Sequence, residues 1–121
     1  MDIKTECSRN EILYKGKTYP CTVSLTMSLV GGKWKAVLLY HLMQGPRRYS
    51  ELRREIPAVT EMTMSLQLKQ LENDGIIHRT VTGTKPPLMV TYRLTTMGET
   101  LIPLLNAITN WGNGVVEKDK G

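Results

Sequence analysis

The chain has 121 residues, of which 40% are hydrophobic and 22% are charged, and its formal net charge is +5. This length suits one domain with a modest core, and the composition excludes a disordered chain. No run approaches the roughly 18 apolar residues of a membrane span, and the polar segment from Met1 to Cys7 argues against a signal peptide. We therefore expect a cytoplasmic protein without membrane contact, and its basic charge favours a polyanionic partner.

Cysteine and histidine usage argues against a metal centre and against catalysis. The chain contains two cysteines, Cys7 and Cys21, without a CxxC motif, and its two histidines, His41 and His78, lie far from both in sequence. We expect reduced thiols in a cytoplasmic protein, no metal site and no cofactor. No nucleophile with a neighbouring base, pair of carboxylates or phosphate-binding glycine loop is evident, so the pattern does not indicate an enzyme.

The first part of the chain predicts a polar segment followed by two helices. Residues 1–20 are predicted to form a polar arm. Apolar residues from position 22 onward predict a short helix, which the glycine pair at 31–32 ends. A second helix is predicted over about residues 33–43, and the Gly-Pro pair at 45–46 stops it.

The next two predicted helices are joined by a short turn. Ser50 is predicted as the N-cap of a helix over residues 51–56. Thr60 is predicted to cap a longer helix over about residues 61–73, with Gly75 as the residue after its C-cap. Two helices joined in this way are typical of a helix-turn-helix. The longer helix has one apolar stripe that is expected to face a core, at Met64, Leu68 and Leu71.

The remaining chain predicts a β-hairpin and a final helix. Residues 76–82 are rich in β-branched side chains, and residues 88–94 alternate apolar and polar side chains, as strands do. A hairpin directly after a helix-turn-helix is a wing. From Thr95 onward a long apolar stripe predicts a helix that reaches Trp111, and Pro103 inside it is expected to kink that helix.

Several short segments form an ordered set along the chain. They are GGKWK at 31–35, GPRRYSEL at 45–52 and LKQLENDGI at 68–76, followed by Val90, Tyr92, Leu94, Thr95, Gly98, Pro103 and Trp111. This set resembles the HxlR-type winged helix regulators of bacteria, over about residues 21–111. The resemblance implies a mainly α, α+β fold: a winged helix-turn-helix with a two-stranded wing and with N- and C-terminal dimerisation helices. The domain would then occupy residues 21–115, after an arm at 1–20 and before a polar tail at 116–121.

The resemblance implies a sequence-specific transcription regulator that binds double-stranded DNA. In such proteins the second helix of the pair enters the major groove, and the wing reaches the backbone or the minor groove. Glutamine and hydroxyl side chains can read base edges, whereas arginine and lysine contact phosphates. The candidate DNA-contacting residues are Arg48, Ser50, Thr60, Thr63, Ser65, Gln67, Gln70, Arg79 and Lys85, and Arg47, Arg53 and Arg54 are further candidates for phosphate contacts.

The apolar stripe of the last helix is longer than one small core requires. It can pack against the first helix of the same chain, or it can form a dimer seam with that helix, as the resemblance implies. A homodimer would present two recognition helices about one DNA turn (~34 Å) apart, which predicts a palindromic operator. The candidate interface residues are Leu25, Leu101, Leu104, Leu105, Ile108 and Trp111.

Cys21 is the candidate regulatory residue. It lies at the predicted N-terminus of the first helix, where the helix dipole lowers the pKa of a thiol. The resemblance implies that an oxidant or electrophile modifies a cysteine at this place and releases DNA. The alternative is a small buried hydrophobic residue. Cys7 is a candidate partner in an intersubunit disulfide.

A second class of binding protein stays open. Met62 and Leu66 are apolar residues on the outward face of the recognition helix. They are compatible with a winged helix that serves as a protein–protein interaction module and does not read DNA. Salt-dependent binding to random duplex DNA would distinguish the two classes.

Overall fold

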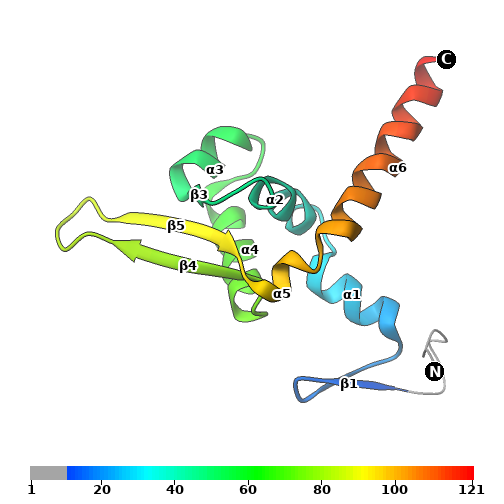
Figure 1. The fold of residues 1–121 in the computed structure, drawn as a ribbon, viewed down its shortest axis with the longest axis horizontal. Helices are drawn as coiled ribbons and strands as arrows, with labels where there is room; N and C mark the ends of the chain where they lie inside the picture. The colour runs from blue at the N-terminus through cyan, green and yellow to red at the C-terminus, as the bar shows by residue number, and fades with distance from the viewer. Residues whose placement is uncertain (1–10) are drawn as a thin grey trace.

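A short hairpin opens the part of the chain that the computed structural model describes, residues 11–121 (Figure 1). Strands β1 (Ile12–Tyr14) and β2 (Lys17–Tyr19) pair antiparallel, with Ile12 opposite Tyr19. Two residues with positive φ, Lys15 and Gly16, turn the chain between them. The hairpin differs from the polar arm expected over residues 1–20, of which residues 1–10 lie outside the described part.

The hairpin is held by contacts that are distant in sequence. The hydroxyl of Tyr14 donates to the sulfur of Met97 at 3.9 Å, and Lys15 Nζ donates to the carbonyl oxygen of Asp74 at 3.4 Å. No local sequence pattern predicts contacts between residues so far apart, and for this reason the segment was expected to be an arm.

Two helices follow, close to their predicted positions. Helix α1 (Thr22–Val30) ends at its C-cap Gly31, whose N–H donates to Met27, and α2 (Lys35–Leu42) begins two residues later than expected. Neither helix has a side-chain N-cap. Most of their stability therefore has to come from packing.

The helix-turn-helix consists of α3 (Tyr49–Glu55) and α4 (Glu61–Asn73). Helix α4 has the predicted bounds: its apolar stripe is fully buried, and Gly75 takes a positive φ of 77°. The prediction for Ser50 is wrong, because α3 begins at Tyr49 and its N-cap is Arg48. The carboxylate of Glu51 accepts the N–H of Arg48 at 2.8 Å, which satisfies an N-terminal donor without a hydroxyl cap.

The wing belongs to a sheet with one more strand than expected. Strands β4 (Ile77–Thr82) and β5 (Met89–Leu94) form the predicted hairpin, with Ile77 opposite Leu94. A two-residue strand, β3 (Arg47–Arg48), pairs antiparallel with β5 and completes the order β3-β5-β4. This pairing joins the start of α3 directly to the wing.

The C-terminal part contains two helices instead of one kinked helix. Helix α5 (Thr96–Glu99) is capped by Thr95, and α6 (Ile102–Lys120) starts anew with Pro103 in its first turn. The predicted kink at Pro103 is therefore wrong, because a proline in the first turn removes no required hydrogen bond. Helix α6 also extends through most of the expected polar tail at 116–121. No helix in the described residues is long and apolar enough to cross a membrane.

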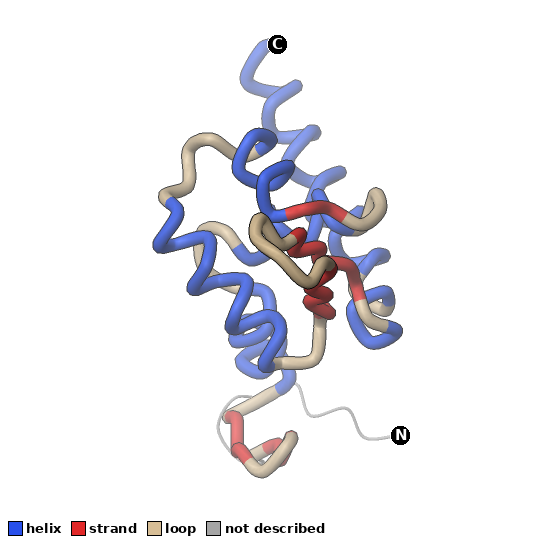
Figure 2. The backbone as a smooth tube through the Cα atoms, turned by 90° about the vertical axis from the view of Figure 1, so that its left-hand side faces the viewer, coloured by secondary structure: helices blue, strands red, loops and turns tan. Residues whose placement is uncertain are grey.

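The core lies where the helices meet the base of the sheet. Figure 2 looks along the wing and shows the helices around this base, with the hairpin of β1 and β2 at the end opposite the C-terminus of α6. The core is formed by apolar side chains from α1 to α4, β4 and β5, with Leu105 from α6, and includes Leu38, Leu39, Leu52, Met64, Leu68, Leu71 and Ile77.

Candidate nucleic-acid interface

Helix α4 separates a buried side from an exposed side. Thr60 Oγ1 accepts the N–H of Thr63 at 3.1 Å, so the first turn is capped as predicted. The C-terminus closes with two hydrogen bonds, from Gly75 N–H to Glu72 at 3.0 Å and from Ile76 N–H to Leu71 at 3.0 Å. With both ends fixed, the helix holds an outward row at defined positions, and the exposed residues of that row are Met62, Ser65, Leu66 and Lys69.

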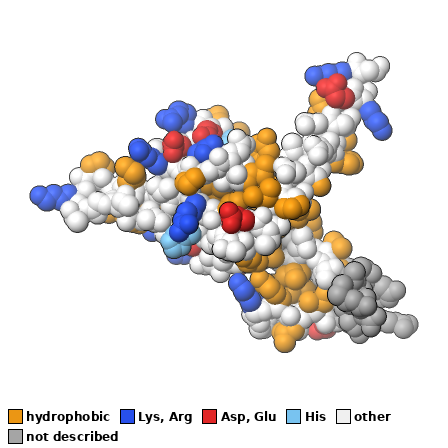
Figure 3. Space-filling model, viewed as in Figure 1, with side chains coloured by type: hydrophobic (Ala, Val, Ile, Leu, Met, Phe, Trp, Pro, Cys, Tyr) orange, Lys and Arg blue, Asp and Glu red, His pale blue; other side chains and the backbone are white. Residues whose placement is uncertain are grey.

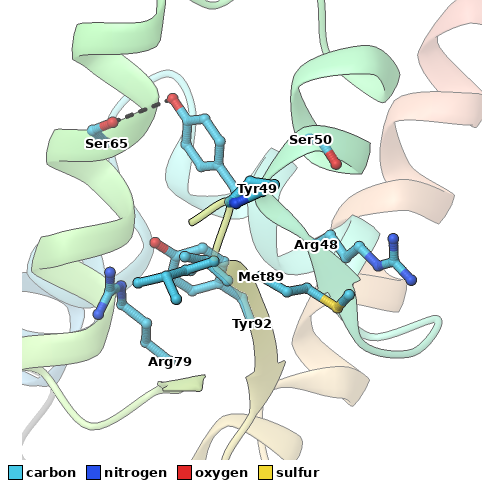
Figure 4. A pocket seen from close by; sticks show the side chains of 10 residues that line it. Arg48, Tyr49, Ser50, Ser65, Arg79, Met89 and Tyr92 are labelled. Carbon is cyan, nitrogen blue, oxygen red and sulfur yellow. Dashed lines mark hydrogen bonds between the residues drawn. The ribbon is translucent and has the colours of Figure 1, made fainter. Parts of the chain in front are cut away.

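A hollow of about 620 Å³ lies between α4, the start of α3 and the wing, and we call it the wing hollow (Figure 4). In this view Tyr49 extends from α3 toward Ser65 on α4, and their oxygens are 3.3 Å apart. Tyr92 is buried within the hollow. The lining combines hydroxyls, two arginines and an apolar wall; its residues are Arg48, Tyr49, Ser50, Ser65, Arg79, Pro87, Leu88, Met89, Val90 and Tyr92.

Two arginines at the wing hollow are available to an external anion. Arg48 and Arg79 are exposed and lie on opposite sides of Tyr92 in Figure 4. Within the described part of the chain, neither guanidinium forms a hydrogen bond or ion pair. Their opposed positions along the hollow suit contacts to a phosphate backbone, because arginine binds phosphate through several N–H donors.

Two of the further phosphate-contact candidates are used inside the protein. Arg47 Nε donates to Glu55 Oε2 at 3.0 Å, and its Nη1 donates to the carbonyl of Pro46 at 3.1 Å. Arg53 Nη1 donates to the carbonyl of Val59 at 2.6 Å. Both half-buried side chains brace the helix-turn-helix through these bonds, and a phosphate contact from either stays a prediction.

The carboxylate of Glu55 joins α2, β3 and α3. His41 Nδ1 lies 2.8 Å from Glu55 Oε1, on the same carboxylate that Arg47 contacts. The hydrogen bond with His41 is the largest effect that holds the pKa of Glu55 below its ordinary value of 4.5; Arg47 acts in the same direction, and desolvation opposes both. This cluster fixes the base of α3 and leaves its N-terminus facing the wing hollow.

Not every predicted contact residue lies at the wing hollow. The hydroxyl of Thr60 also donates to Thr63 Oγ1 at 3.0 Å, so both side chains take part in capping α4. Gln67 is half-buried. Gln70 lines a different hollow with Lys17 and Lys35, on the side of α4 that faces α1 and β2.

The wing carries a further positive charge at its tip. Lys85 is exposed in the loop between β4 and β5, as expected for a residue at the wing tip. Figure 3 shows basic side chains at this tip and along the body beside it. Sequence reasoning missed Tyr49, whose contribution depends on how α3 is rotated toward α4.

The predicted dimer residues fall into two groups. Leu105 is only 2% exposed and belongs to the core, where α6 contacts α2, so its surface is already used within the monomer. Leu101 and Leu104 are partly buried against the same core, and Leu25 is half-buried. In contrast, Trp111 is 75% and Ile108 45% exposed.

The exposed group extends over two helices. Figure 3 shows hydrophobic side chains gathered along α1 and where α6 leaves the body. Sequence reasoning missed four of these residues, which lie on α1 or near the end of α6: Val23, Met27, Val115 and Val116, each between 46% and 59% exposed.

Cys21 is the N-cap of α1 and is fully buried. Its side chain is disulfide-bonded, in contrast to the expected reduced thiol. Cys7, the candidate for an intersubunit disulfide, lies outside the described residues. Among the described residues, no group of three or more histidine, cysteine or acidic side chains is placed to hold a metal ion.

Comparison with known proteins matches the chain to the model of one protein family. The model described as HxlR-like helix-turn-helix matches residues 29–120. The HTH-type transcriptional regulator YdeP of Bacillus subtilis is 46% identical over 92 residues, which cover 76% of this chain and 71% of YdeP. YybR of the same organism, also an HTH-type transcriptional regulator, is 43% identical and aligns over 81% of each chain.

Solved structures show the same fold. The redox regulator HypR in its oxidised form matches with a TM-score of 0.73 and 42% identity, over 78% of this chain and 96% of HypR. Its reduced form matches with a TM-score of 0.74 and 41% identity, over 80% and 98%. The HTH-type regulator ytcD matches with a TM-score of 0.74 and 39% identity, over 78% and 96%.

Proposed function

Because the chain belongs to the HxlR-like helix-turn-helix family, a family of DNA-binding transcriptional regulators, we propose that it is a sequence-specific regulator that binds a palindromic DNA operator as a homodimer. The observation that carries the proposal is the wing hollow. It combines the exposed side of α4, the start of α3 and the wing around two arginines that have no partner in the described chain. A helix in the major groove and a wing on the backbone would use these parts together.

The test is DNA binding measured by fluorescence anisotropy over a range of salt concentrations. Each lost phosphate contact lowers the slope of log Kd against log salt by about 0.9. Arg79→Ala should therefore weaken binding and reduce the slope by about one. Arg93→Ala is the matched control, because Arg93 is adjacent to Tyr92 on β5 and lines a separate hollow with His78 and Glu99. Equal slopes for the two variants would contradict the assignment of this face.

The homodimer is supported by the apolar surface on α1 and α6. Burying a large aromatic residue such as Trp111, which is 75% exposed, would favour association through these helices. Light scattering after size exclusion should give twice the monomer mass for the wild type and a lower mass for a Trp111→Glu variant. A Lys118→Glu variant is the matched control on the same helix. A monomeric wild type that still binds DNA would overturn the dimer and, with it, the palindrome.

We also propose that the redox state of Cys21 controls DNA binding. Cys21 is buried at the start of α1, so a change at its sulfur disturbs a helix that carries part of the exposed apolar surface. The similarity to a regulator solved in oxidised and reduced forms supports this proposal. Reducing a disulfide to two thiols takes two electrons and two protons, which dithiothreitol supplies in the assay.

The redox proposal is tested by DNA affinity with dithiothreitol or diamide. The wild type should change its Kd between the two conditions, and Cys21→Ser should not. Cys7→Ser is the companion variant. A Cys21→Ser protein with the wild-type response would remove Cys21 from the mechanism and leave the DNA-binding proposal intact.

A further inference from the structure

An apolar pair interrupts the exposed side of the recognition helix. Met62 is 83% exposed and Leu66 is 53% exposed, whereas Met64 and Leu68 on the same helix are at most 1% exposed. These two side chains therefore do not contribute to the core. Exposing large apolar side chains on an otherwise polar helix face lowers solubility, so such a pair points to a binding role.

The geometry of α4 places the pair at the centre of its exposed side. An α-helix turns about 100° per residue, so positions 62 and 66 lie opposite the buried stripe and on one face, about 6 Å apart along the axis. Ser65 and Lys69 are exposed beside them, and Ser65 also lines the wing hollow. The apolar pair and the arginines of the hollow thus belong to one continuous surface.

We propose that Met62 and Leu66 read thymine methyl groups in the major groove. This inference rests on the proposed function and names the bases that the protein would select. Thymine presents a C5-methyl group in that groove, and apolar side chains contact it favourably. Because successive bases are about 3.4 Å apart, a spacing of about 6 Å predicts two thymines within about two base-pair steps in each half-site.

The charges around the pair favour DNA over a protein partner. Lys69 is on the same face, and Arg48 and Arg79 lie across the wing hollow without partners in the described chain. Glu61, at the first turn of α4, is the acidic residue closest to Met62 in sequence. A surface of this kind would attract a polyanion along its length while its apolar centre meets the floor of the groove.

The experiment replaces thymine by deoxyuridine, which pairs in the same way but has no methyl group. A binding site is first selected from a library of random duplex DNA with the 121-residue chain. Each thymine of the selected site is then replaced in turn, and Kd is measured by anisotropy. At contacted positions we expect affinity to fall about four-fold for each methyl group lost. In the Met62→Ala and Leu66→Ala variants, the same replacement should change affinity less than about two-fold.

The controls separate this inference from the proposed function. Leu13→Ala removes an exposed leucine, 71% accessible, from the β1 strand of the hairpin, and should keep the full response to deoxyuridine. Enrichment of a site that is indifferent to deoxyuridine at every position would overturn the inference and leave DNA binding established. A response that persists in Met62→Ala and Leu66→Ala would also overturn it. Failure to enrich any DNA would overturn the proposed function itself and point to a protein partner for the pair.

Discussion

The hydroxyl of Thr95 holds together the end of the recognition helix and the base of the wing. Its Oγ1 donates one hydrogen bond, shared between the carbonyls of Gly75 at 2.6 Å and Ile76 at 3.1 Å, and accepts a second from the N–H of Gly98 at 3.0 Å. Its backbone N–H donates to Ile76 at 3.0 Å. Valine has nearly the shape of threonine but lacks the hydroxyl, so Thr95→Val removes the two side-chain bonds.

The cost follows from these two bonds. The lost N-cap of α5 is worth about 1 kcal/mol, and the lost hydrogen bond to Gly75 about 1 kcal/mol more. We expect the free energy of unfolding to fall by about 2 kcal/mol and the Tm by about 8 °C. Urea unfolding followed by circular dichroism, at matched protein concentrations, should show a lower midpoint with an unchanged m-value.

Thr95→Ser is the control, because serine keeps both bonds, and it should retain most of the wild-type stability. A Thr95→Val protein within about 0.5 kcal/mol of the wild type would show that the hydroxyl does not hold this junction.

Three further changes test other parts of the structure. Gly98→Ala should prevent stable folding, because a Cβ at this buried position overlaps the carbonyl oxygen of Ile76; a wild-type melting curve would contradict this. Glu55→Gln should reduce stability at neutral pH. Since the folded-state pKa of Glu55 is lowered, its contribution is present above pH 4.5 and is lost as the pH falls through the folded-state pKa. The gap between the two proteins in pH-dependent melting should therefore close on acidification, and a constant gap would refute this origin. Leu68→Ala should cost about 2–5 kcal/mol in urea unfolding, whereas Leu66→Ala should stay within about 0.5 kcal/mol, and similar losses would contradict their different burial.

Local chemistry made the recognition helix predictable. Thr60, the apolar stripe and Gly75 each mark the bounds of α4, and the structure has a cap, a buried side and a positive φ at these positions. In the wing, the alternation of apolar and polar side chains over residues 88–94 predicted β5, and the β-branched side chains of residues 76–82 predicted β4. In these elements the signal lies within a few residues of the structure it predicts.

The features that were missed depend on distant contacts. The strand β3 is only two residues long and exists because it pairs with Tyr92 and Thr91 of β5. The start of α3 at Tyr49 follows from this pairing, since the chain leaves the strand directly into the helix. At Pro103 the sequence signal was present but was interpreted differently. A proline predicted a kink within one helix, whereas the structure shows that a new helix begins there.

The sequence predicted which residues belong to the candidate site better than it predicted how they are arranged in space. Arg48, Ser50, Ser65 and Arg79 were all candidates, and the structure brings them to one hollow. Gln70 faces a different hollow, because the rotation of α4 is set by its packing against α2 and β4. Since both residues are arginines, the sequence could not show that Arg47 is bonded within the protein while the guanidinium of Arg48 is exposed at the hollow.

In helix α4, the residues that stabilise the core differ from the residues proposed to contact bases. Its buried stripe supports the core, whereas Met62, Leu66 and Lys69 of the outward row lie outside the core and, within the described residues, only Ser65 of that row contacts another element, at Tyr49 of α3. Under the proposed function, gene duplicates of such a protein can therefore diverge at positions 62, 66 and 69 and acquire new operators while each remains folded. The same separation makes the fold a suitable scaffold for directed evolution of DNA specificity, with a library confined to three codons.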